Sequence, residues 1–267
     1  MTRSRFLTAW LLGGLLFLYG PIAVLVATSF NASSLMTEWT GFSLRWYRAL
    51  LHDRTLIDAA LLSLRIAAVA ATGATVLGGL AGFALARMPN LAGRRTMAGL
   101  LAAPLVLPDL LIGLSLLLLF VASEMLLGVP NGRGAGTVAI AHATMCLSYV
   151  AVVVEARLAA GGTVLEMAAM DLGAGPVMAF LRITLPLMAP ALVSGWLLAF
   201  TLSLDDVVVA SFTSGPGATT LPMVVYSTLR LGPTPVLNAL ATVVLALAAG
   251  AAAAIWVLGR RGEAAAG

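Results

Sequence analysis

Three carboxylates interrupt long apolar stretches of this chain, and they have the clearest capacity for binding chemistry. Asp109 follows Pro104 and Pro108 within one apolar run, and Asp205 and Asp206 stand together near the end of another. A carboxylate inside a membrane-spanning segment costs a few kcal/mol, so it normally faces protein or a water-filled cavity. Fixed negative charge beside a cavity favours cations over anions and neutral sugars. These residues are therefore candidates to line a pathway for a small cation.

Each of these residues also has a structural interpretation. Asp109 is expected near the middle of the bilayer, where it would touch a solute midway or serve assembly alone. Arg65 stands at a depth from which it can pair with Asp205 or Asp206. Successive helical residues point about 100° apart, so one of the two is expected to face the pathway. The other would bond Arg65, a neighbouring subunit or the backbone. Trp196, also inside a span, either packs or stacks on the solute.

Composition excludes most catalytic classes. All 15 basic side chains are arginine, so the chain has no lysine for a P-loop or a Schiff base. The single cysteine, Cys146, allows neither an intramolecular disulfide nor a thiolate metal cluster. His52 and His142 are far apart, and we interpret them as interfacial or packed residues rather than ligands. We therefore expect no enzyme activity, no catalytic residue and no metal site. The arginines form no aromatic-interleaved patch, which excludes nucleic acid.

The chain is too apolar to fold in water. It is 61% hydrophobic and 10% charged, whereas soluble domains carry about 25% charged residues. A bilayer core takes about 20 apolar residues per helix, and six segments have this length. The predicted spans are 6–28, 57–86, 97–121, 135–155, 187–210 and 236–258. The predicted fold class is thus all-α, a single polytopic membrane domain over residues 1–267, with Pro104 and Pro108 breaking the third helix.

Arginine placement predicts the orientation of these spans. Six spans place both termini on one side, and cytoplasmic segments are enriched in Lys and Arg. One side carries Arg3, Arg5, Arg87, Arg94, Arg95, Arg157, Arg182, Arg260 and Arg261, and the other carries Arg45, Arg48, Arg54, Arg133 and Arg230. Both termini are therefore expected in the cytoplasm, together with the connection at 156–186. On the outer side, the segment 30–56 contains Trp39, Trp46 and Tyr47, which suit a helix lying at the membrane interface.

The connection contains a short punctuated unit, EMAAMDLGAGPVMAFLRITLP at 166–186. Thr163 and Glu166 have the spacing of a capping box, and Gly173 has the position of a left-handed helix end. The first helix has an apolar stripe of Leu165, Ala168, Ala169 and Leu172. Pro176 is placed to start a second short helix, and Pro186 to mark entry to the next span. The stripe of this second helix is Val177, Phe180 and Leu181.

This spacing resembles a loop in the permease subunits of bacterial ABC importers. The pattern of that family runs Glu-Ala-Ala, three residues, Gly, nine residues and Ile-x-Leu-Pro. The matching positions are Ala168, Ala169, Gly173, Ile183, Leu185 and Pro186. Met167 stands where the pattern has glutamate, and Glu166 comes one position earlier, so contacts made by that carboxylate are expected to differ. In the family, this loop docks into a groove on the nucleotide-binding subunit and transmits its closure.

Further stretches resemble the polyamine branch of the family, particularly the putrescine permeases. They are RWY at 45–47, APLVLPDLLIGLSLLLLF at 103–120, SLDD at 203–206 and SGPGATTLP at 214–222. The resemblance covers nearly the whole chain. It implies a multi-pass, non-catalytic subunit of a binding-protein-dependent importer in the bacterial inner membrane, carrying putrescine or spermidine.

The resemblance also implies partners. They are a second homologous permease subunit, two ABC ATPase subunits and a periplasmic substrate-binding protein, with lipid around the spans. ATP would be bound by the partner subunits, so no cofactor is expected on this chain.

Three alternative functions stay open. One is an ABC permease for another small solute. Another is an ion-coupled secondary transporter using the intramembrane Asp residues, although no internal repeat supports it. A third is a non-transporting membrane scaffold.

Overall fold

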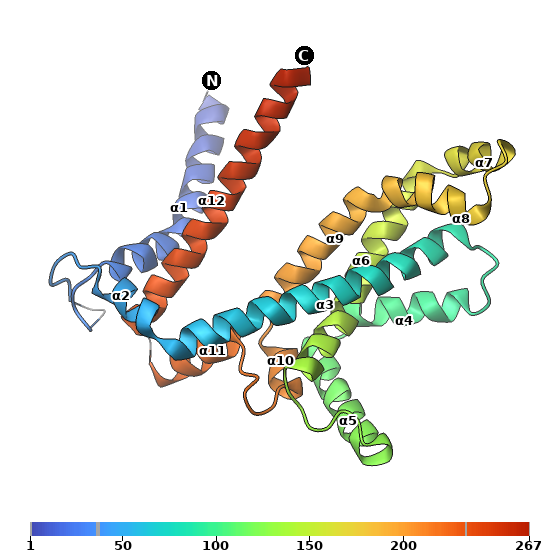
Figure 1. Ribbon diagram of the computed structural model, residues 1–267. Coiled ribbons are helices and arrows are strands. Elements are labelled where there is room, and N and C mark those ends of the chain that lie inside the picture. Colours follow the sequence, from blue (N-terminus) through green and yellow to red (C-terminus); the bar gives the residue numbers. More distant parts are fainter. Residues whose placement is uncertain (1, 36–37, 233, 267) are drawn as a thin grey trace. The chain divides into compact units, whose positions relative to one another are not determined.

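Regular structure in the described part of the chain is helical, apart from one isolated antiparallel bridge between Asn31 and Phe42. The computed structural model describes residues 2–35, 38–232 and 234–266, and the side chains of 6–35, 38–232, 234–250, 252 and 253. In chain order the elements are α1 Thr2–Ser29, α2 Arg45–His52, α3 Arg54–Arg87, α4 Arg94–Val106, α5 Asp109–Leu127, α6 Ala135–Gly161, α7 Val164–Asp171, α8 Pro176–Ala179, η1 Phe180–Thr184 (a π-helix), α9 Leu185–Asp205, α10 Val208–Thr213, α11 Leu221–Leu231 and α12 Pro235–Ala266 (Figure 1). The all-α prediction is confirmed.

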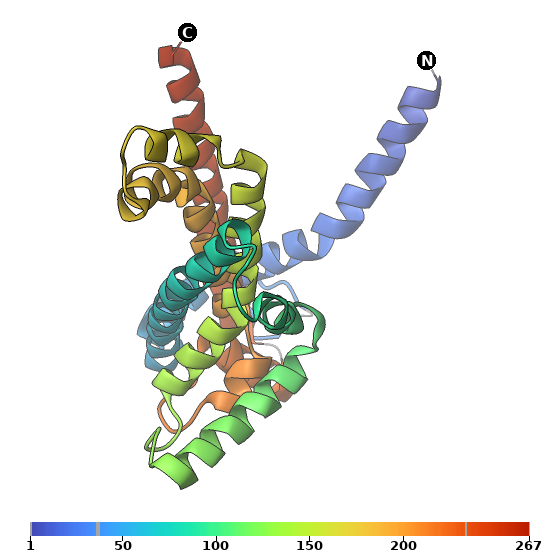
Figure 2. The same cartoon turned by 90° about the vertical axis from the view of Figure 1, so that its right-hand side faces the viewer.

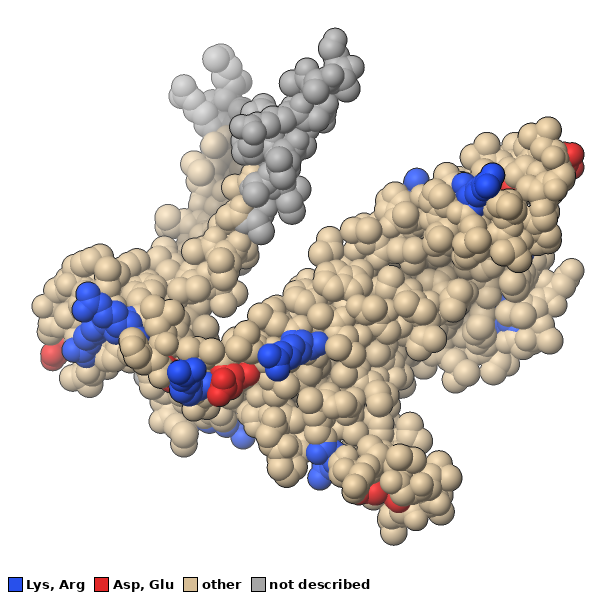
Figure 3. Space-filling view, in the orientation of Figure 1, with Lys and Arg blue, Asp and Glu red and all other residues tan. Residues whose placement is uncertain are grey.

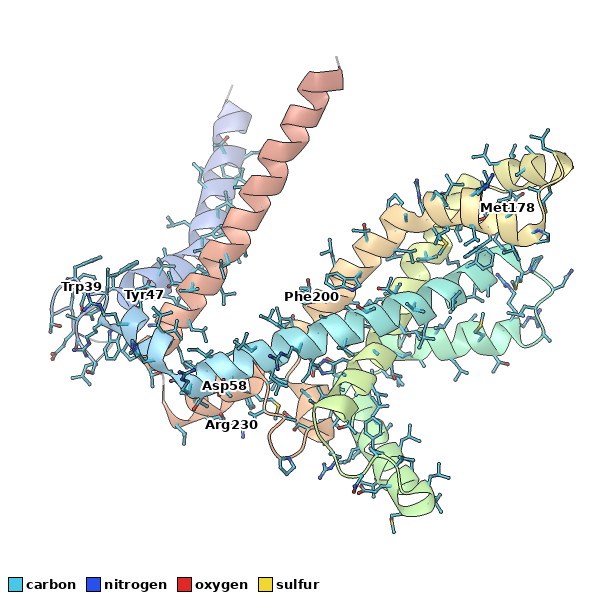
Figure 4. All side chains as sticks on the ribbon, viewed as in Figure 1. Trp39, Tyr47, Asp58, Met178, Phe200 and Arg230 are labelled. Carbon is cyan, nitrogen blue, oxygen red and sulfur yellow. The ribbon has the colours of Figure 1, made fainter. Side chains whose placement is uncertain are left out.

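The helices divide into two compact units, residues 1–57 with 225–267 and residues 58–224. In the first unit, α12 packs against α1 and α2. Asn238 Nδ2 of α12 donates to Thr28 Oγ1 of α1 at 3.0 Å. Ser29 at the end of α1 shares a 2.6 Å hydrogen bond with the hydroxyl of Tyr47 in α2, a residue labelled in Figure 4. The helix expected within 30–56 is therefore present as α2, while its place at the membrane interface stays a prediction.

In the second unit, α6 lies at the centre and packs against α4, α9 and α10. Two glycines one turn apart on α3 allow it to approach α6 closely. A Cβ on Gly78 would lie 2.5 Å from the Leu147 carbonyl oxygen, and one on Gly82 would lie 2.5 Å from that of Ala151. Small residues four apart are typical of helix pairs in membranes, because there backbone packing replaces the hydrophobic effect as the force that holds helices together.

The described residues contain five helices long and apolar enough to cross a membrane, and a shorter apolar stretch, Pro235–Gly250, lies at the sixth predicted position. All six predicted spans thus have a helical counterpart. The side chains at the end of the sixth span (254–258) and those of Arg3, Arg5, Arg260 and Arg261 lie outside the described residues.

The helices differ in their limits from three of the predicted spans, whose limits within the membrane stay predictions. The third span is two helices, α4 and α5, separated at Leu107 and Pro108. Leu107 is extended at ψ 139, as a residue before proline is biased to be. Only Pro108 causes this break, because Pro104 lies inside α4. The fourth span continues to Gly161, and the fifth starts earlier and ends at Asp205 rather than 210.

The second unit has two ends formed by different helices. Figures 1 and 2 show α7 and α8 at one end and α5 and α10 at the other. Helix α9 connects the two regions over its 21 residues. At 1.5 Å per residue this is about 30 Å, the thickness of a bilayer core.

Candidate functional site

A helix, a sharp turn and a second helical turn form the end at α7 and α8, as the sequence predicts. Gly173 has φ 91, the left-handed conformation expected of it. The Ala174 N–H donates to the Ala169 carbonyl at 3.0 Å, and the Gly173 N–H to the Met170 carbonyl at 2.9 Å. These two bonds form a Schellman motif, which satisfies the last carbonyls of α7 and reverses the chain. Pro176 occupies the first turn of α8, also as predicted.

The predicted capping box is wrong. Thr163 precedes α7, but its side chain makes no capping hydrogen bond. Glu166 instead turns toward the bundle, where Oε2 lies 2.8 Å from Arg87 Nε and Oε1 accepts from Thr184 Oγ1 at 2.9 Å. A buried guanidinium and a hydroxyl satisfy this carboxylate better than exposed backbone N–H groups at the helix start. Glu166 is only 9% exposed, so the carboxylate is not presented at the surface.

The separate second helix is also wrong. After Ala179 the chain continues through η1 directly into α9, so α8 is the first turn of the fifth span. Within η1 the Leu185 N–H donates to the Phe180 carbonyl, five residues back. Pro186 and Pro190 have no N–H to donate to the preceding turns, and the backbone adapts by widening rather than by breaking. Pro186 therefore lies within a continuous helical segment.

The apolar stripes of this unit lie on its surface. Leu165 and Leu172 on α7 and its turn are 58% and 90% exposed, and Val177 on α8 is 72% exposed. Met167, at the position of the family's glutamate, is 48% exposed, and Met178 is labelled at this end in Figure 4. The surface of this end is predominantly uncharged (Figure 3). The predicted apolar stripes are thus available for contact with a partner, and the docking role of this end stays a prediction.

The matched motif residues differ in burial. Ala168 on α7 and Gly173 in the turn are exposed, and Ala169 on α7 is half-buried. Ile183 in η1 and Leu185 at the start of α9 are also half-buried. Leu185 packs against the main hydrophobic core of the unit. The motif thus combines a surface half, on α7 and its turn, with an anchoring half on α9.

The three predicted carboxylates line one pocket at the opposite end of α9. The break at Pro108 places Asp109 at the first residue of α5, and Asp205 and Asp206 follow from the end of α9. Together with Tyr149 they line a cavity of about 340 Å³, whose other lining residues are Met145, Leu202, Val207 and Val208. The break at Pro108 lets Asp109 and Asp205 line the same pocket, and the mid-bilayer depth expected for Asp109 stays a prediction.

Asp206 has a structural role that the sequence left among several alternatives. Its carboxylate accepts from the backbone N–H of Ala210 at 2.7 Å and of Val209 at 3.3 Å, at the start of α10. Its Oδ2 also lies 3.1 Å from Nε2 of His142. The backbone alternative is therefore confirmed, while the side chain beside this carboxylate is that of His142 rather than Arg65. Asp205, one residue earlier, is exposed on the pocket.

Sequence reasoning missed the polar role of His142 and the place of Tyr149. His142 is fully buried, as a packed residue should be, but its Nδ1 is 2.7 Å from Ser203 Oγ. Tyr149 lies among apolar residues of α6. Two polar aromatic residues seven positions apart share one face of a helix, and this spacing was the available signal for both.

Trp196 does not line the pocket. Its Nε1 donates to Thr72 Oγ1 at 3.1 Å, and its ring stacks on Phe200 with centroids 5.2 Å apart. Phe200 is labelled along α9 in Figure 4. These contacts agree with the packing interpretation. A role in the substrate pathway for Trp196 stays a prediction.

Substitutions of Asp205 and Asp206 should have different effects, one on transport and the other on the stability of the fold. We expect Asp206→Ala to lower the free energy of unfolding by about 2–3 kcal/mol, because α10 loses its cap and His142 loses its carboxylate. Asp205→Ala should change it by less than about 0.5 kcal/mol, yet reduce solute uptake. Thermal unfolding of the purified variants and uptake into vesicles measure the two effects. Equal stability losses would contradict this division.

The fold is that of ABC transporter permease subunits. A solved bacterial ABC transporter involved in the import of the acidic polysaccharide alginate aligns with TM-score 0.67 at 16% identity over 96% of both chains. An amino acid ABC transporter with histidines aligns with TM-score 0.55 at 19% identity, over 79% of this chain and 96% of the other. At such identities the likeness concerns the fold alone. No family model matches the sequence.

Sequence relatives are more specific. The chain is 51% identical over 263 residues to the putrescine transport system permease protein PotI of Escherichia coli strain K12, over 98% of this chain and 94% of that protein. It is 44% identical over 231 residues to the spermidine/putrescine transport system permease protein PotC of Haemophilus influenzae, over 86% and 87%.

The chain therefore belongs to the polyamine branch of the ABC importer permeases, the family of PotI and PotC. It is a non-catalytic, multi-pass subunit of the bacterial inner membrane, and a separate subunit hydrolyses ATP. An importer of this class comprises permease, ATPase and binding-protein components.

Proposed function

We propose that this chain forms part of the pathway through which putrescine or spermidine enters the cell, driven by ATP hydrolysis on partner subunits. The observation that carries the proposal is the pocket at Asp109, Asp205 and Asp206, at one end of α9, with the exposed apolar surface of α7 and α8 at the other. A solute site and a motor-docking site are thereby separated by about the thickness of a bilayer core.

Arginine positions support a cytoplasmic location for the docking end, and six spans would place both termini on the same side as this connection. Arg87 ends α3, Arg94 and Arg95 start α4, Arg157 lies in the last turns of α6, and Arg182 lies in η1. All of them belong to segments at the α7 and α8 end, and clustered arginines favour the cytoplasmic side. The pocket then opens toward the periplasm, where a binding protein delivers the solute.

Charge supports an amine as the solute. Putrescine carries two ammonium groups, and carboxylates beside a pocket with low-dielectric walls attract such a dication while repelling anions. Tyr149 adds a ring face that can hold an ammonium by cation–π attraction. Asp109 and Asp205 are the residues proposed to contact the solute, because Asp206 already binds His142 and the backbone of α10.

The same proposal assigns the partners. Two ATPase subunits would bind the docking ends of this chain and of a second, homologous permease, and ATP would bind to them alone, so this chain needs no cofactor. ATPase closure would move α7 and α8, and the pathway would alternate between outward and inward access.

Reconstitution tests this function. With its second permease, ATPase and binding protein in proteoliposomes, the chain should import radiolabelled putrescine or spermidine only when ATP is present on the side of the membrane that the ATPase faces. The double variant Asp109→Asn, Asp205→Asn should lower uptake at limiting solute by about tenfold or more, because two fixed charges are lost from the pocket. Asp58→Asn is the matched control, because Asp58 lies on α3 (Figure 4) and is not among the residues that line the pocket.

Two outcomes would contradict the proposal. Uptake that persists with a hydrolysis-dead ATPase but collapses with an uncoupler would indicate ion coupling instead. Import of sulfate or another small anion, with no amine import, would overturn the assigned solute.

A further inference from the structure

The side chain of Arg87 connects the end of α3 to two other segments, the C-terminal end of α6 and α7. Its Nη1 donates to the Leu158 carbonyl at 3.0 Å and its Nη2 to the Gly162 carbonyl at 2.6 Å, so it binds the C-terminal end of α6. Its Nε lies 2.8 Å from Glu166 Oε2 on α7. The Arg87 and Glu166 side chains are only 10% and 11% exposed. A guanidinium with every nitrogen engaged holds its partners in one orientation.

Glu166 extends the connection to the fifth span. Its Oε1 accepts a 2.9 Å hydrogen bond from Thr184, which is 3% exposed and closes the π-helical segment before α9. We call Arg87, Glu166 and Thr184 the polar joint. Through it, α7 is bonded to α3, to the end of α6 and to the entry of α9.

Little else fixes α7 to the bundle. Glu166 is the single buried residue of this helix, all of which is described. Val164, Leu165, Met167 and Met170 are between 45% and 69% exposed. A cavity of about 400 Å³, lined by Phe83, Met88, Met167, Met170, Phe180 and the polar joint among others, lies beneath the helix. Apolar side chains around a cavity can slide or repack, whereas charge-assisted hydrogen bonds at fixed distances do not.

We propose that the polar joint is the connection through which displacement of α7 moves α3, α6 and α9 together. This inference rests on the proposed function, because it concerns how the docking end drives the spans. Arg87 and Glu166 act as positioning residues and contact no solute. Removing one partner of a buried ion pair leaves an uncompensated charge, so Arg87 and Glu166 keep their mutual geometry when α7 is displaced, and force transmission requires such a fixed geometry. The π-helical segment beside Thr184 fits this role, since π-bulges recur at functional sites.

Coupling efficiency provides the first test. In the reconstituted importer, Glu166→Gln and Thr184→Val should leave ATPase co-purification and basal ATP hydrolysis unchanged. They should raise the ATP hydrolysed per amine imported by about tenfold, as expected when one link of a coupling network is loosened. Arg87→Lys keeps the positive charge but loses the planar guanidinium that donates to several partners at once. Its ratio of ATP hydrolysed to amine imported should lie between those of the wild type and Glu166→Gln. Asp171→Asn, an exposed carboxylate on the same helix, is the matched control and should match the wild type.

A distance measurement provides the second test and needs no transport. Cys146 is buried and is replaced by alanine, and spin labels are attached at Leu172→Cys, beside α7, and Arg95→Cys, on α4. Both positions are exposed. In the full chain in nanodiscs, the wild type should give a narrow distance distribution by electron–electron double resonance. Glu166→Gln and Thr184→Val should each broaden it.

The outcomes separate the two proposals. If both variants keep distance distributions as narrow as that of the wild type and an unchanged ratio of ATP hydrolysed to amine imported, the proposed role of the polar joint is wrong. The proposed importer function would be unaffected. A wild type that imports no amine with ATP would overturn the proposed function, and the distance distributions would still decide whether the joint fixes α7. Thr184→Val retains the ion pair, so it tests the joint even if Glu166→Gln fails to fold.

Discussion

Replacing Gly82 with leucine is expected to abolish folding of the permease. A Cβ at this position would lie 2.5 Å from the Ala151 carbonyl oxygen and 3.0 Å from the Cβ of Val154. The nearest atom belongs to the helix backbone, which cannot rotate away as a side chain does. Overpacking costs about 1–3 kcal/mol even when side chains yield, and here α3 must separate from α6. Because α6 is the centre of the second unit, that separation exposes its core.

The measurement is the yield of monodisperse protein after detergent extraction, with its thermal midpoint. Gly99→Leu is the matched control, because Gly99 is an exposed helical glycine on α4 and a Cβ added to it would meet nothing within 4 Å. It should retain the wild-type midpoint. A Gly82→Leu variant that extracts and unfolds like the Gly99→Leu variant would show that the close approach of α3 to α6 is not required.

Replacing Gly173 with valine is expected to uncouple the importer without unfolding its spans. Gly173 has φ 91, where a β-branched residue is strained by about 1–3 kcal/mol. In the variant, we expect this strain to break the two hydrogen bonds of the Schellman motif, so that α7 and α8 no longer keep a fixed relative orientation. Nothing lies within 4 Å of an added Cβ, so the effect comes from the backbone alone. ATP-driven uptake should fall by about tenfold or more, with the thermal midpoint nearly unchanged.

The chain offers a control two residues away. Gly175 has φ −68 and ψ 161, a conformation open to any residue, and its surroundings are equally empty. Gly175→Val should therefore transport nearly as well as the wild type. Uptake assays, together with the amount of ATPase that co-purifies, distinguish the two variants. Normal transport by Gly173→Val would contradict the docking account of this turn.

Local chemistry made parts of this site predictable. The φ of Gly173, the first-turn position of Pro176 and the break before Pro108 depend on sterics within a few residues. The lengths of the apolar runs depend only on bilayer thickness. These features need no knowledge of distant partners. The structure has the turn at Gly173, the start of α8 at Pro176 and the break before Pro108, and its described residues contain five helices of membrane length.

The predicted partners of polar side chains were wrong where both a local and a distant group could bind the same side chain. Glu166 has the spacing to cap α7, but Arg87, 79 positions away in the sequence, provides a buried cation instead. Asp206 has the depth to meet Arg65, but α6 places His142 beside it. Spacing along one helix cannot show which residue of another helix lies opposite.

The sequence by itself determined the class of this protein: a chain with too little charge to fold in water, built of membrane-length helices, with a punctuated loop between its fourth and fifth spans. The tertiary structure alone decided how the charged residues are used. It placed Asp109 and Asp205 around one pocket, Asp206 against α10 and His142, and the Glu166 side chain inside the bundle. The physical reason is that an apolar pattern is a property of consecutive residues, whereas the energy of a buried charge depends on which groups the packed helices place within a few ångströms of it.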